Sequence, residues 1–232
     1  MHINQLLTAL PPSAYSRLAP HLQTCSLDSG QIIYEANETI EFAYFPNRAM
    51  ISLVSIMEDG ATTEIGLIGN EGMVGLPIIL GSPRSSSRAI VQVAGDSIKI
   101  SAKILQEEFK TSEQLRHLLL LYTQAFLTQV SQTAACNRQH NIEERLARWL
   151  LSVHDCILED ELPLTQEFVA NMLGVRRSGV TIAANTLQKA GIIQYRRGKI
   201  TILNHRALEA TSCECYKLVQ GEFIRLLGFR RG

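Results

Sequence analysis

The chain has 232 residues, 46% of them hydrophobic, and its 22 Lys and Arg residues balance its 22 Asp and Glu residues. That is the composition of a globular protein, with enough length for a substantial core in one large domain or two small ones. The five cysteines form no disulfide framework, no secretory signal is recognised, and no apolar run reaches the ~18 residues of a membrane helix. We therefore expect a reduced, cytoplasmic protein that makes no membrane contact.

The balanced totals conceal an uneven distribution of charge along the chain. Residues 1–144 carry 9 Lys and Arg against 14 Asp and Glu, whereas residues 145–232 carry 13 against 8. Such an asymmetry indicates an acidic front part and a back part that faces nucleic acid.

The front part reads as an all-β unit. After two short helical stretches within residues 3–20, apolar and polar residues alternate from residue 22 to residue 101, with turn signals about every 8–12 residues. Many short strands at this spacing predict a β-sandwich or a jelly-roll barrel. The expected strands are Leu22–Leu27, Gln31–Tyr34, Phe42–Pro46, Met50–Ile56, Thr63–Ile68, Ala89–Val93 and Ser97–Ser101.

A short helix over residues 101–111 and a long helix from Ser112 are expected next. The long helix carries an apolar stripe at helical spacing, formed by Leu115, Leu119, Tyr122, Phe126, Val130 and Thr133. We expect this stripe to exceed what one barrel can cover, so that a second copy of the chain buries it as in a two-stranded coiled coil. The alternative is a helix that packs only on its own barrel. The polar residues 137–141 indicate a hinge.

The back part has the pattern of a winged helix-turn-helix. A helix over residues 142–156 braces it, and Thr165 is a good cap for the helix that Gly174 ends. A second helix runs to Gly191, and Arg196-Arg197-Gly198 is a tight hairpin between two short apolar runs. Residues 206–227 are expected to form one amphipathic helix, and residues 229–232 to be frayed.

The basic residues of this segment lie where a winged helix-turn-helix meets DNA phosphates. Between residues 163 and 206 the only acidic residue is Glu167, and the positive charges gather at the start of the second helix and at the wing. A solvated surface is the alternative interpretation. The predicted DNA-binding residues are Thr165, Arg176, Arg177, Ser178, Thr181, Lys189, Arg196, Arg197 and Lys199.

With these residues in this order, nearly the whole chain resembles the Crp/Fnr family of bacterial transcription regulators. The resemblance rests on Tyr44-Phe45-Pro46, Asp59-Gly60, residues 69–75, Gln92–Gly95, Glu144–Ala147, Leu164–Glu167, Leu173–Arg177 and Leu187–Ile193. It implies an α+β fold with a sensor jelly-roll β-barrel (1–111), a dimerisation helix and hinge (112–141) and a winged helix-turn-helix DNA-binding domain (142–232). It further implies a homodimer on pseudo-palindromic double-stranded DNA, RNA polymerase as a partner, and a small-molecule effector.

The recognition helix departs from the family pattern at two positions. Arg177 stands where the family has an Arg that forks onto guanine. Ser178 stands where a Glu is usual, and Ile182 where a second base-reading Arg often lies. We therefore expect a half-site that differs from the commonest one in the family.

The effector segment departs further. Family members that bind a cyclic nucleotide have a Gly-Glu turn followed by Arg-Ser or Arg-Thr, but this chain has Gly75-Leu76-Pro77 and then Ser85-Ser86. A cyclic nucleotide bound in the usual way is not expected. The alternatives are an anion held by arginines and serines, or a plain polar loop. The predicted effector residues are Gly75, Leu76, Arg84, Ser85, Ser86 and Arg88.

Metal and cofactor chemistry receives little support from the sequence. Only Cys25 lies in the first 135 residues, so no iron–sulfur cluster of the oxygen-responsive branch is expected. His117 and His140 are candidate haem ligands, although each reads better as a surface histidine. Cys213-x-Cys215 is too closely spaced and too isolated for a zinc site, so no metal is expected and redox sensing is a minor option.

An enzyme is not expected either. Residues 22–101 contain no histidine for a metal-dependent oxygenase, and no nucleophile elbow, P-loop or zinc-protease motif is present. A redox- or haem-responsive regulator of the same fold and a scaffold protein that does not bind DNA are the remaining alternatives.

Overall fold

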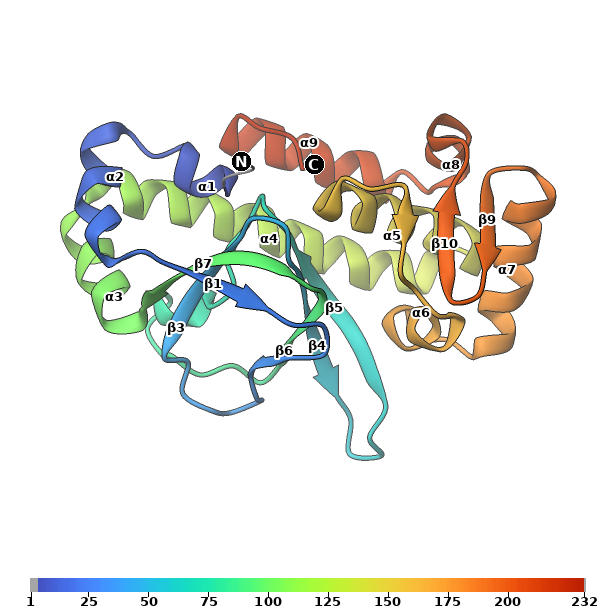
Figure 1. The fold of residues 1–232 in the computed structure, drawn as a ribbon, viewed down its shortest axis with the longest axis horizontal. Helices are drawn as coiled ribbons and strands as arrows, with labels where there is room; N and C mark the ends of the chain where they lie inside the picture. Colours follow the sequence, from blue (N-terminus) through green and yellow to red (C-terminus); the bar gives the residue numbers. More distant parts are fainter. Residues whose placement is uncertain (1–3, 232) are drawn as a thin grey trace.

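Residues 4–231 are described by the computed structural model, which has the predicted α+β fold (Figure 1). Seven strands form two antiparallel sheets with the orders β1-β7-β3 and β2-β6-β4-β5. The predicted strands are confirmed to within two residues, but the two sheets stay separate, so the expected barrel is not closed. The strands are β1 Gln23–Leu27, β2 Ile32–Tyr34, β3 Phe42–Pro46, β4 Met50–Ile56, β5 Thr62–Ile68, β6 Arg88–Val93 and β7 Gly95–Ser101.

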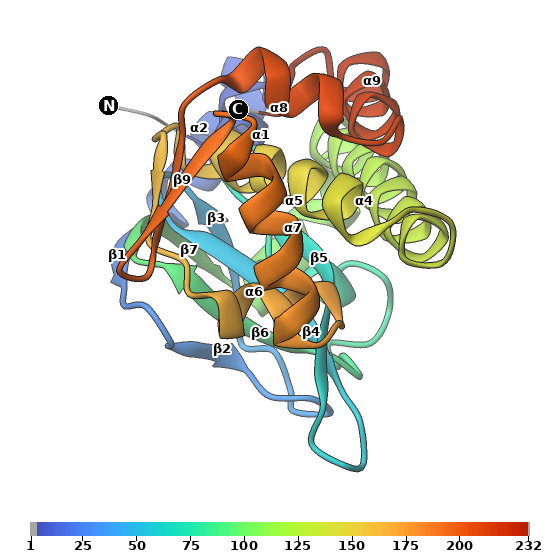
Figure 2. The same cartoon turned by 90° about the vertical axis from the view of Figure 1, so that its right-hand side faces the viewer.

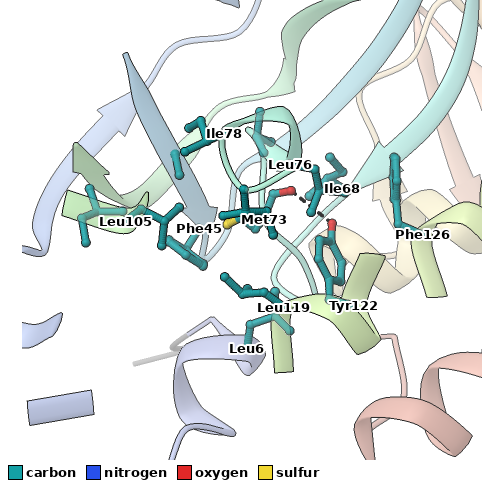
Figure 3. Close-up of a cluster of buried hydrophobic side chains, with 14 of the residues drawn as sticks. Leu6, Phe45, Ile68, Met73, Leu76, Ile78, Leu105, Leu119, Tyr122 and Phe126 are labelled. Atoms are coloured by element: carbon teal, nitrogen blue, oxygen red, sulfur yellow. Dashed lines mark hydrogen bonds between the residues drawn. The ribbon is translucent and has the colours of Figure 1, made fainter. Parts of the chain in front are cut away.

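Asn4 fixes the start of the described chain to the sensor sheets. Its side-chain oxygen accepts hydrogen bonds from the backbone N–H groups of Leu6 and Leu7 and so caps α1 (Gln5–Thr8). Its side-chain amide donates to the carbonyl oxygens of Pro46 and Gly72, at 2.9 and 2.8 Å. Helix α1 and the following α2 (Pro12–Leu18) thereby bury Leu6 and its neighbours in the sensor core (Figure 3).

The long helix α4 (Glu113–Gln139) follows α3 (Ala102–Thr111) and lies along the sensor sheets. The hydroxyl of Tyr122 donates to the carbonyl oxygen of Met73 at 3.2 Å inside the core (Figure 3). A Cβ at Gly66 on β5 would lie 2.5 Å from the ring of Phe126. Only glycine at that position therefore allows the helix to approach the sheet so closely.

The expectation that the apolar stripe of α4 needs a second copy to bury it is wrong. Leu115, Leu119, Tyr122 and Phe126 are buried within a single chain, and Val130 and Thr133 are half-buried. Two elements of the same chain cover the helix, namely β5 and the C-terminal helix α9 (Cys215–Leu227). The sequence stripe therefore marks an intramolecular core, but the alternative of packing only on its own barrel is incomplete, because α9 covers the helix as well.

The back part contains the predicted helix-turn-helix and wing. Helix α5 (Ile142–Ile157) begins with a capping box between Asn141 and Glu144, so the chain leaves α4 within the predicted hinge. Helices α6 (Gln166–Leu173) and α7 (Arg177–Lys189) follow, and strands β9 (Ile193–Arg196) and β10 (Lys199–Ile202) form the wing. A short strand that the sequence prediction lacks, β8 (Glu161–Leu162), pairs with β10.

The C-terminal segment is two helices rather than the one that was predicted. Helix α8 (His205–Thr211) ends where Ser212 adopts an extended conformation, and α9 begins at Cys215. Residues 212–214 turn the chain so that α9 lies along α4 (Figure 1). Cys213 and Cys215 are buried at this turn, and both lie beside Cys136 and His140 at the end of α4.

The prediction of a frayed C-terminus is wrong for Arg231. Only 4% of this residue is exposed, and its guanidinium forms an ion pair with Glu71 at 2.9 Å. Burial acts to lower the pKa of Arg231, but Glu71, Cys156 and Asp155 together outweigh burial and place that pKa above its ordinary value. The end of the chain is therefore joined to the sensor by a buried charge pair.

The back part also packs on its own sensor. Trp149 on α5 donates a hydrogen bond to one carboxylate oxygen of Glu64 on β5 at 2.9 Å, and Ser52 donates to the other at 2.6 Å. Burial raises the pKa of Glu64 above its ordinary value, although both hydrogen bonds act against the shift. Met50, Val54 and other sensor residues share a hydrophobic core with the helix-turn-helix, so sensor and DNA-binding part form one continuous structure.

Candidate nucleic-acid interface

The two helices of the helix-turn-helix are held by local hydrogen bonds. The hydroxyl of Thr165 accepts from the backbone N–H of Phe168 at 3.2 Å and so caps α6, as predicted. Gly174 ends α6 with a φ of 61°, which an L side chain rarely adopts. The guanidinium of Arg145 on α5 donates to the carbonyl oxygen of Leu173 and fixes the end of α6.

Helix α7 has one buried face and one exposed face. Val180, Ala183, Ala184 and Leu187 pack inward against α5 and α6, as predicted. The opposite face carries Arg177, Ser178, Ile182 and Asn185, and 69% of Ile182 is exposed. The helix lies at the outer edge of the molecule, where its exposed face can meet a partner (Figures 1 and 2).

Three segments meet on the same side of the helix-turn-helix. The hydroxyl of Thr181 on α7 donates to the side-chain oxygen of Gln166 on α6 at 2.8 Å. The backbone N–H of Gln166 donates to the hydroxyl of Tyr195 in the wing at 3.3 Å. A Cβ at Gly198 in the wing turn would lie 3.6 Å from the methyl group of Thr165. The first turns of α6 and α7 and the tip of the wing are thus neighbours.

The wing turn exposes two arginines. Arg196 pairs with Lys199, and the two residues between them, Arg197 and Gly198, have φ values of 50° and 81°. Positive φ at both central residues is the signature of a type I′ hairpin turn, which suits the twist of the strands. Arg196 and Arg197 are exposed at this tip.

The basic residues differ in how freely they can meet an anion. Arg177 contacts Glu167 at 3.9 Å, but both side chains are about two-thirds exposed, so the pair is weak and Arg177 is available. Lys199 forms an ion pair with Glu161 on β8, which partly neutralises it. Lys189 lies at the far end of α7, about 18 Å from Arg177 at 1.5 Å per residue. Arg176 is exposed directly before α7.

Two residues of this surface are missing from the sequence prediction. Gln166 holds Thr181, and Asn185 stands on the exposed face of α7 one turn after Ile182. Asn185 follows Ser178 by seven residues, a spacing that places both on one helix face, so helical periodicity could have identified it. The role of Gln166 depends on a contact between two helices that periodicity does not reveal.

The predicted effector residues do not lie together at one site in the structure. A cavity of about 170 Å³ between the sensor and α4 is lined by Gly75, Leu76 and Ser85, but not by Arg84, Ser86 or Arg88. Arg88 forms an ion pair with Glu35 at 2.7 Å, and Arg84 lines a separate cleft with Glu38 and Glu41. The cavity has no charged side chain among its described lining residues; the others are Tyr34, Leu53, Ile68, Met73, Pro77, Leu80, Thr123, Phe126 and Leu127.

His117 is a surface histidine, as expected, whereas His140 and the cysteines near it are arranged differently from the expectation. His117 is exposed on α4 and does not line the cavity. His140 is partly exposed and lies beside Cys215 and Cys136. The premise that Cys213 and Cys215 are isolated is therefore wrong, because residues more than 70 positions earlier in the chain join them.

The sequence matches two protein families. Residues 24–112 match the cyclic nucleotide-binding domain, and residues 144–211 match the Crp-like helix-turn-helix domain. No curated protein matches the sequence significantly.

Several solved structures share the fold across most of the chain. A putative transcriptional regulator of the Crp/Fnr family from Eubacterium rectale has a TM-score of 0.70 at 22% identity, covering 89% of this chain and 96% of that one. FixK2 from Bradyrhizobium japonicum has a TM-score of 0.71 at 17% identity, covering 83% and 98%. The c-di-GMP responsive global regulator CLP from Xanthomonas campestris has a TM-score of 0.67 at 14% identity, covering 83% and 99%.

Proposed function

Because this chain is a Crp/Fnr family transcription regulator with a helix-turn-helix DNA-binding domain, we propose that it binds a pseudo-palindromic DNA site as a homodimer. The observation that carries the proposal is the surface where the start of α6, the exposed face of α7 and the tip of the wing meet. Two such surfaces on successive major grooves would lie about 34–36 Å apart on the duplex. The family belongs to transcription control rather than to enzymes.

The roles on this surface follow from side-chain chemistry. Arg177 offers a planar fork that suits guanine O6 and N7 in the major groove, and Ile182 offers an apolar contact for a thymine methyl group. Arg196 and Arg197 in the wing, with Thr165 and Arg176 at the two helix starts, suit phosphate oxygens. Ser178 and Asn185 complete the face that meets base edges.

The wing supplies affinity without sequence preference. Arg196→Ala should weaken binding to all duplexes alike, because a phosphate contact is independent of sequence. It should reduce the magnitude of the slope of log K against log salt by about 1.8, which is about 0.9 for each of the two wings of the dimer. Fluorescence anisotropy between ~50 and ~200 mM salt measures both effects. Lys217→Ala, at an exposed position on α9, is the matched control and should change neither. An unchanged slope for Arg196→Ala would remove the wing from the phosphate interface.

The homodimer proposal rests on the side of α4 that the chain itself leaves uncovered. Leu120 and Leu127 are 47% and 60% exposed, and with Ala134 they recur every seven residues. Thr123, which is buried by its own chain, and Val130, which is half-buried, lie between them at the alternate three- and four-residue steps of a coiled-coil seam. Burying this seam against the same seam of a second chain gives a symmetric dimer.

Leu120→Glu should convert the dimer to a monomer, because it places two like charges in the seam. Native mass spectrometry and sedimentation velocity report the change. Leu203→Glu provides the control, since Leu203 is 56% exposed but follows the wing strand β10. If the Leu120→Glu protein sedimented at the same rate as the wild type, Leu120 would not lie in a dimer interface.

We further propose that the sensor does not hold a cyclic nucleotide in the usual way. The cavity beside α4 has a volume of about 170 Å³, below the ~300–1,000 Å³ of ordinary ligand pockets. In addition, Arg88 already forms an ion pair with Glu35 and is not free to bind a phosphate. Calorimetric titration with cyclic AMP should therefore show no saturable heat at micromolar concentrations. Saturable binding of one molecule per chain would contradict this proposal.

None of the described helices is both long and apolar enough to cross a bilayer. A cytoplasmic location and RNA polymerase as a partner stay predictions.

A further inference from the structure

Four side chains from distant parts of the sequence meet where the long helix ends. Cys136 and His140 lie one turn apart at the end of α4, and Cys213 and Cys215 flank Glu214 at the start of α9. One ligand atom from each side chain, three sulfurs and one imidazole nitrogen, lies within 4.8 Å of all the others. The three cysteines are buried.

The distances between these atoms fit the edges of a tetrahedron around a metal ion. The sulfurs of Cys136 and Cys213 are 3.5 Å apart, and the sulfur of Cys215 is 3.6 Å from Nδ1 of His140. Bonds of about 2.3 Å to sulfur and about 2.0 Å to nitrogen at tetrahedral angles place two sulfurs ~3.8 Å apart, and a sulfur and a nitrogen ~3.5 Å apart. Both distances agree with those values to within about 0.3 Å.

We propose that Cys136, His140, Cys213 and Cys215 bind one Zn²⁺ ion that joins the end of α4 to the start of α9. Thiolates with one imidazole in tetrahedral geometry favour zinc over the hard cations that prefer oxygen ligands. Four protein ligands fill a tetrahedral site, which is the arrangement of structural rather than catalytic zinc.

The surrounding groups support the same site. Nε2 of His140 lies 3.2 Å from a carboxylate oxygen of Glu214, which leaves Nδ1 directed at Cys215. A carboxylate on the second nitrogen is the usual partner of a zinc-bound histidine, because it fixes the ring and its tautomer. The side-chain amide of Gln132 donates to the sulfur of Cys215 at 3.1 Å, as outer groups around zinc thiolates do.

A nearby cation supplies a second, independent observation. Arg148 on α5 is buried, its Nε has no hydrogen-bond partner within the described chain, and its charge acts on Cys136. A Cys₃His zinc centre carries a net charge of −1, because three thiolates outweigh the ion. The site therefore places negative charge beside the guanidinium of Arg148, in addition to the carboxyl group of Glu64, with which Arg148 also interacts.

The position gives the site a structural consequence. His140 is the residue between α4 and the Asn141 cap of α5, and α9 is the helix that covers α4. The ion therefore fixes the path of the chain at the hinge between sensor and DNA-binding part. A metal bound here therefore fixes the orientation of α5, and of the helix-turn-helix that packs on it, relative to α4.

Metal analysis tests the proposal directly. The full chain, expressed without a histidine tag in zinc-supplemented medium and dialysed under reducing conditions, should hold one zinc per chain by inductively coupled plasma mass spectrometry. Cys213→Ser should reduce the zinc content at least tenfold. Cys25→Ser is the matched control, because Cys25 lies on β1 outside the cluster, and it should keep the ion.

A second measurement covers a variant that fails to fold. Wild-type protein stripped with a chelator and titrated with Co²⁺ should develop thiolate-to-metal charge-transfer bands and the strong visible bands of tetrahedral cobalt, saturating at one ion per chain. Wild-type protein that holds no zinc and gives no such spectrum would overturn the site. So would a Cys136–Cys213 disulfide that persists through the reducing purification in place of metal. It would be seen as three titratable thiols instead of five after the protein is denatured without reductant.

Discussion

Replacing Arg231 by methionine will destabilise the folded protein by about 3–5 kcal/mol, the cost of leaving a buried charge without its partner. Glu71 is only 1% exposed, and the guanidinium of Arg231 is the one cation paired with it among the described residues. Without that cation, the carboxylate keeps a hydrogen bond from the backbone N–H of Gly69 at 3.1 Å as its remaining partner. Such a loss is a large share of the 5–15 kcal/mol that stabilises a typical domain.

Urea unfolding measures this loss as a lower midpoint at an unchanged slope. Arg230→Met is the matched control, because Arg230 precedes Arg231 in the chain but is exposed, and it should change stability by less than about 0.5 kcal/mol. The double variant Glu71→Met/Arg231→Met should recover most of the loss, because an apolar pair leaves no buried charge. A loss below about 1 kcal/mol for Arg231→Met would show that the C-terminus is not anchored as described.

Arg177→Ala should weaken binding by roughly 1–3 kcal/mol for each half-site, about 5- to 150-fold in Kd per half-site, and relax the base preference at one position of each half-site. The reason is that a bidentate contact with guanine is lost, whereas phosphate contacts remain. Competition anisotropy against every single-base variant of the site measures both effects. Arg176→Ala, at the neighbouring exposed arginine, should instead weaken random and preferred duplexes to the same degree. If Arg177→Ala reduced the affinity for random and preferred duplexes equally, Arg177 would not contact a base.

The sequence predicted the local elements well because their signals are local. Alternation of side chains located β3 and β4 at their observed bounds, and Thr165 and Gly174 located the ends of α6. The wing turn at Arg197-Gly198 followed from its residue types. Each of these features depends on neighbours within about four residues, which a sequence pattern contains.

Apart from the break at residues 212–214 and the omission of Asn185, the main errors of the sequence prediction concern partners that are distant in the chain. The stripe on α4 was assigned to a second copy because the pattern shows that a face is apolar but not what covers it. Arg231 is held in the interior by its ion pair with Glu71, which lies 160 residues earlier in the chain. Cys136 and Cys213 are 77 residues apart, so the spacing of Cys213-x-Cys215 alone concealed a four-residue cluster. Such pairings arise only when α9 folds back along α4.

Selection of binding sites from a random duplex library shows directly whether this chain binds DNA as a symmetric dimer through α7. The wild-type protein should enrich an inverted repeat whose half-sites are centred about one helical turn, or a whole number of turns, apart. Guanine should be fixed at one position of each half-site for the wild type and lost for Arg177→Ala. No enrichment, or enrichment of a single unrepeated half-site by the wild-type protein, would show that the chain does not bind DNA as a symmetric dimer.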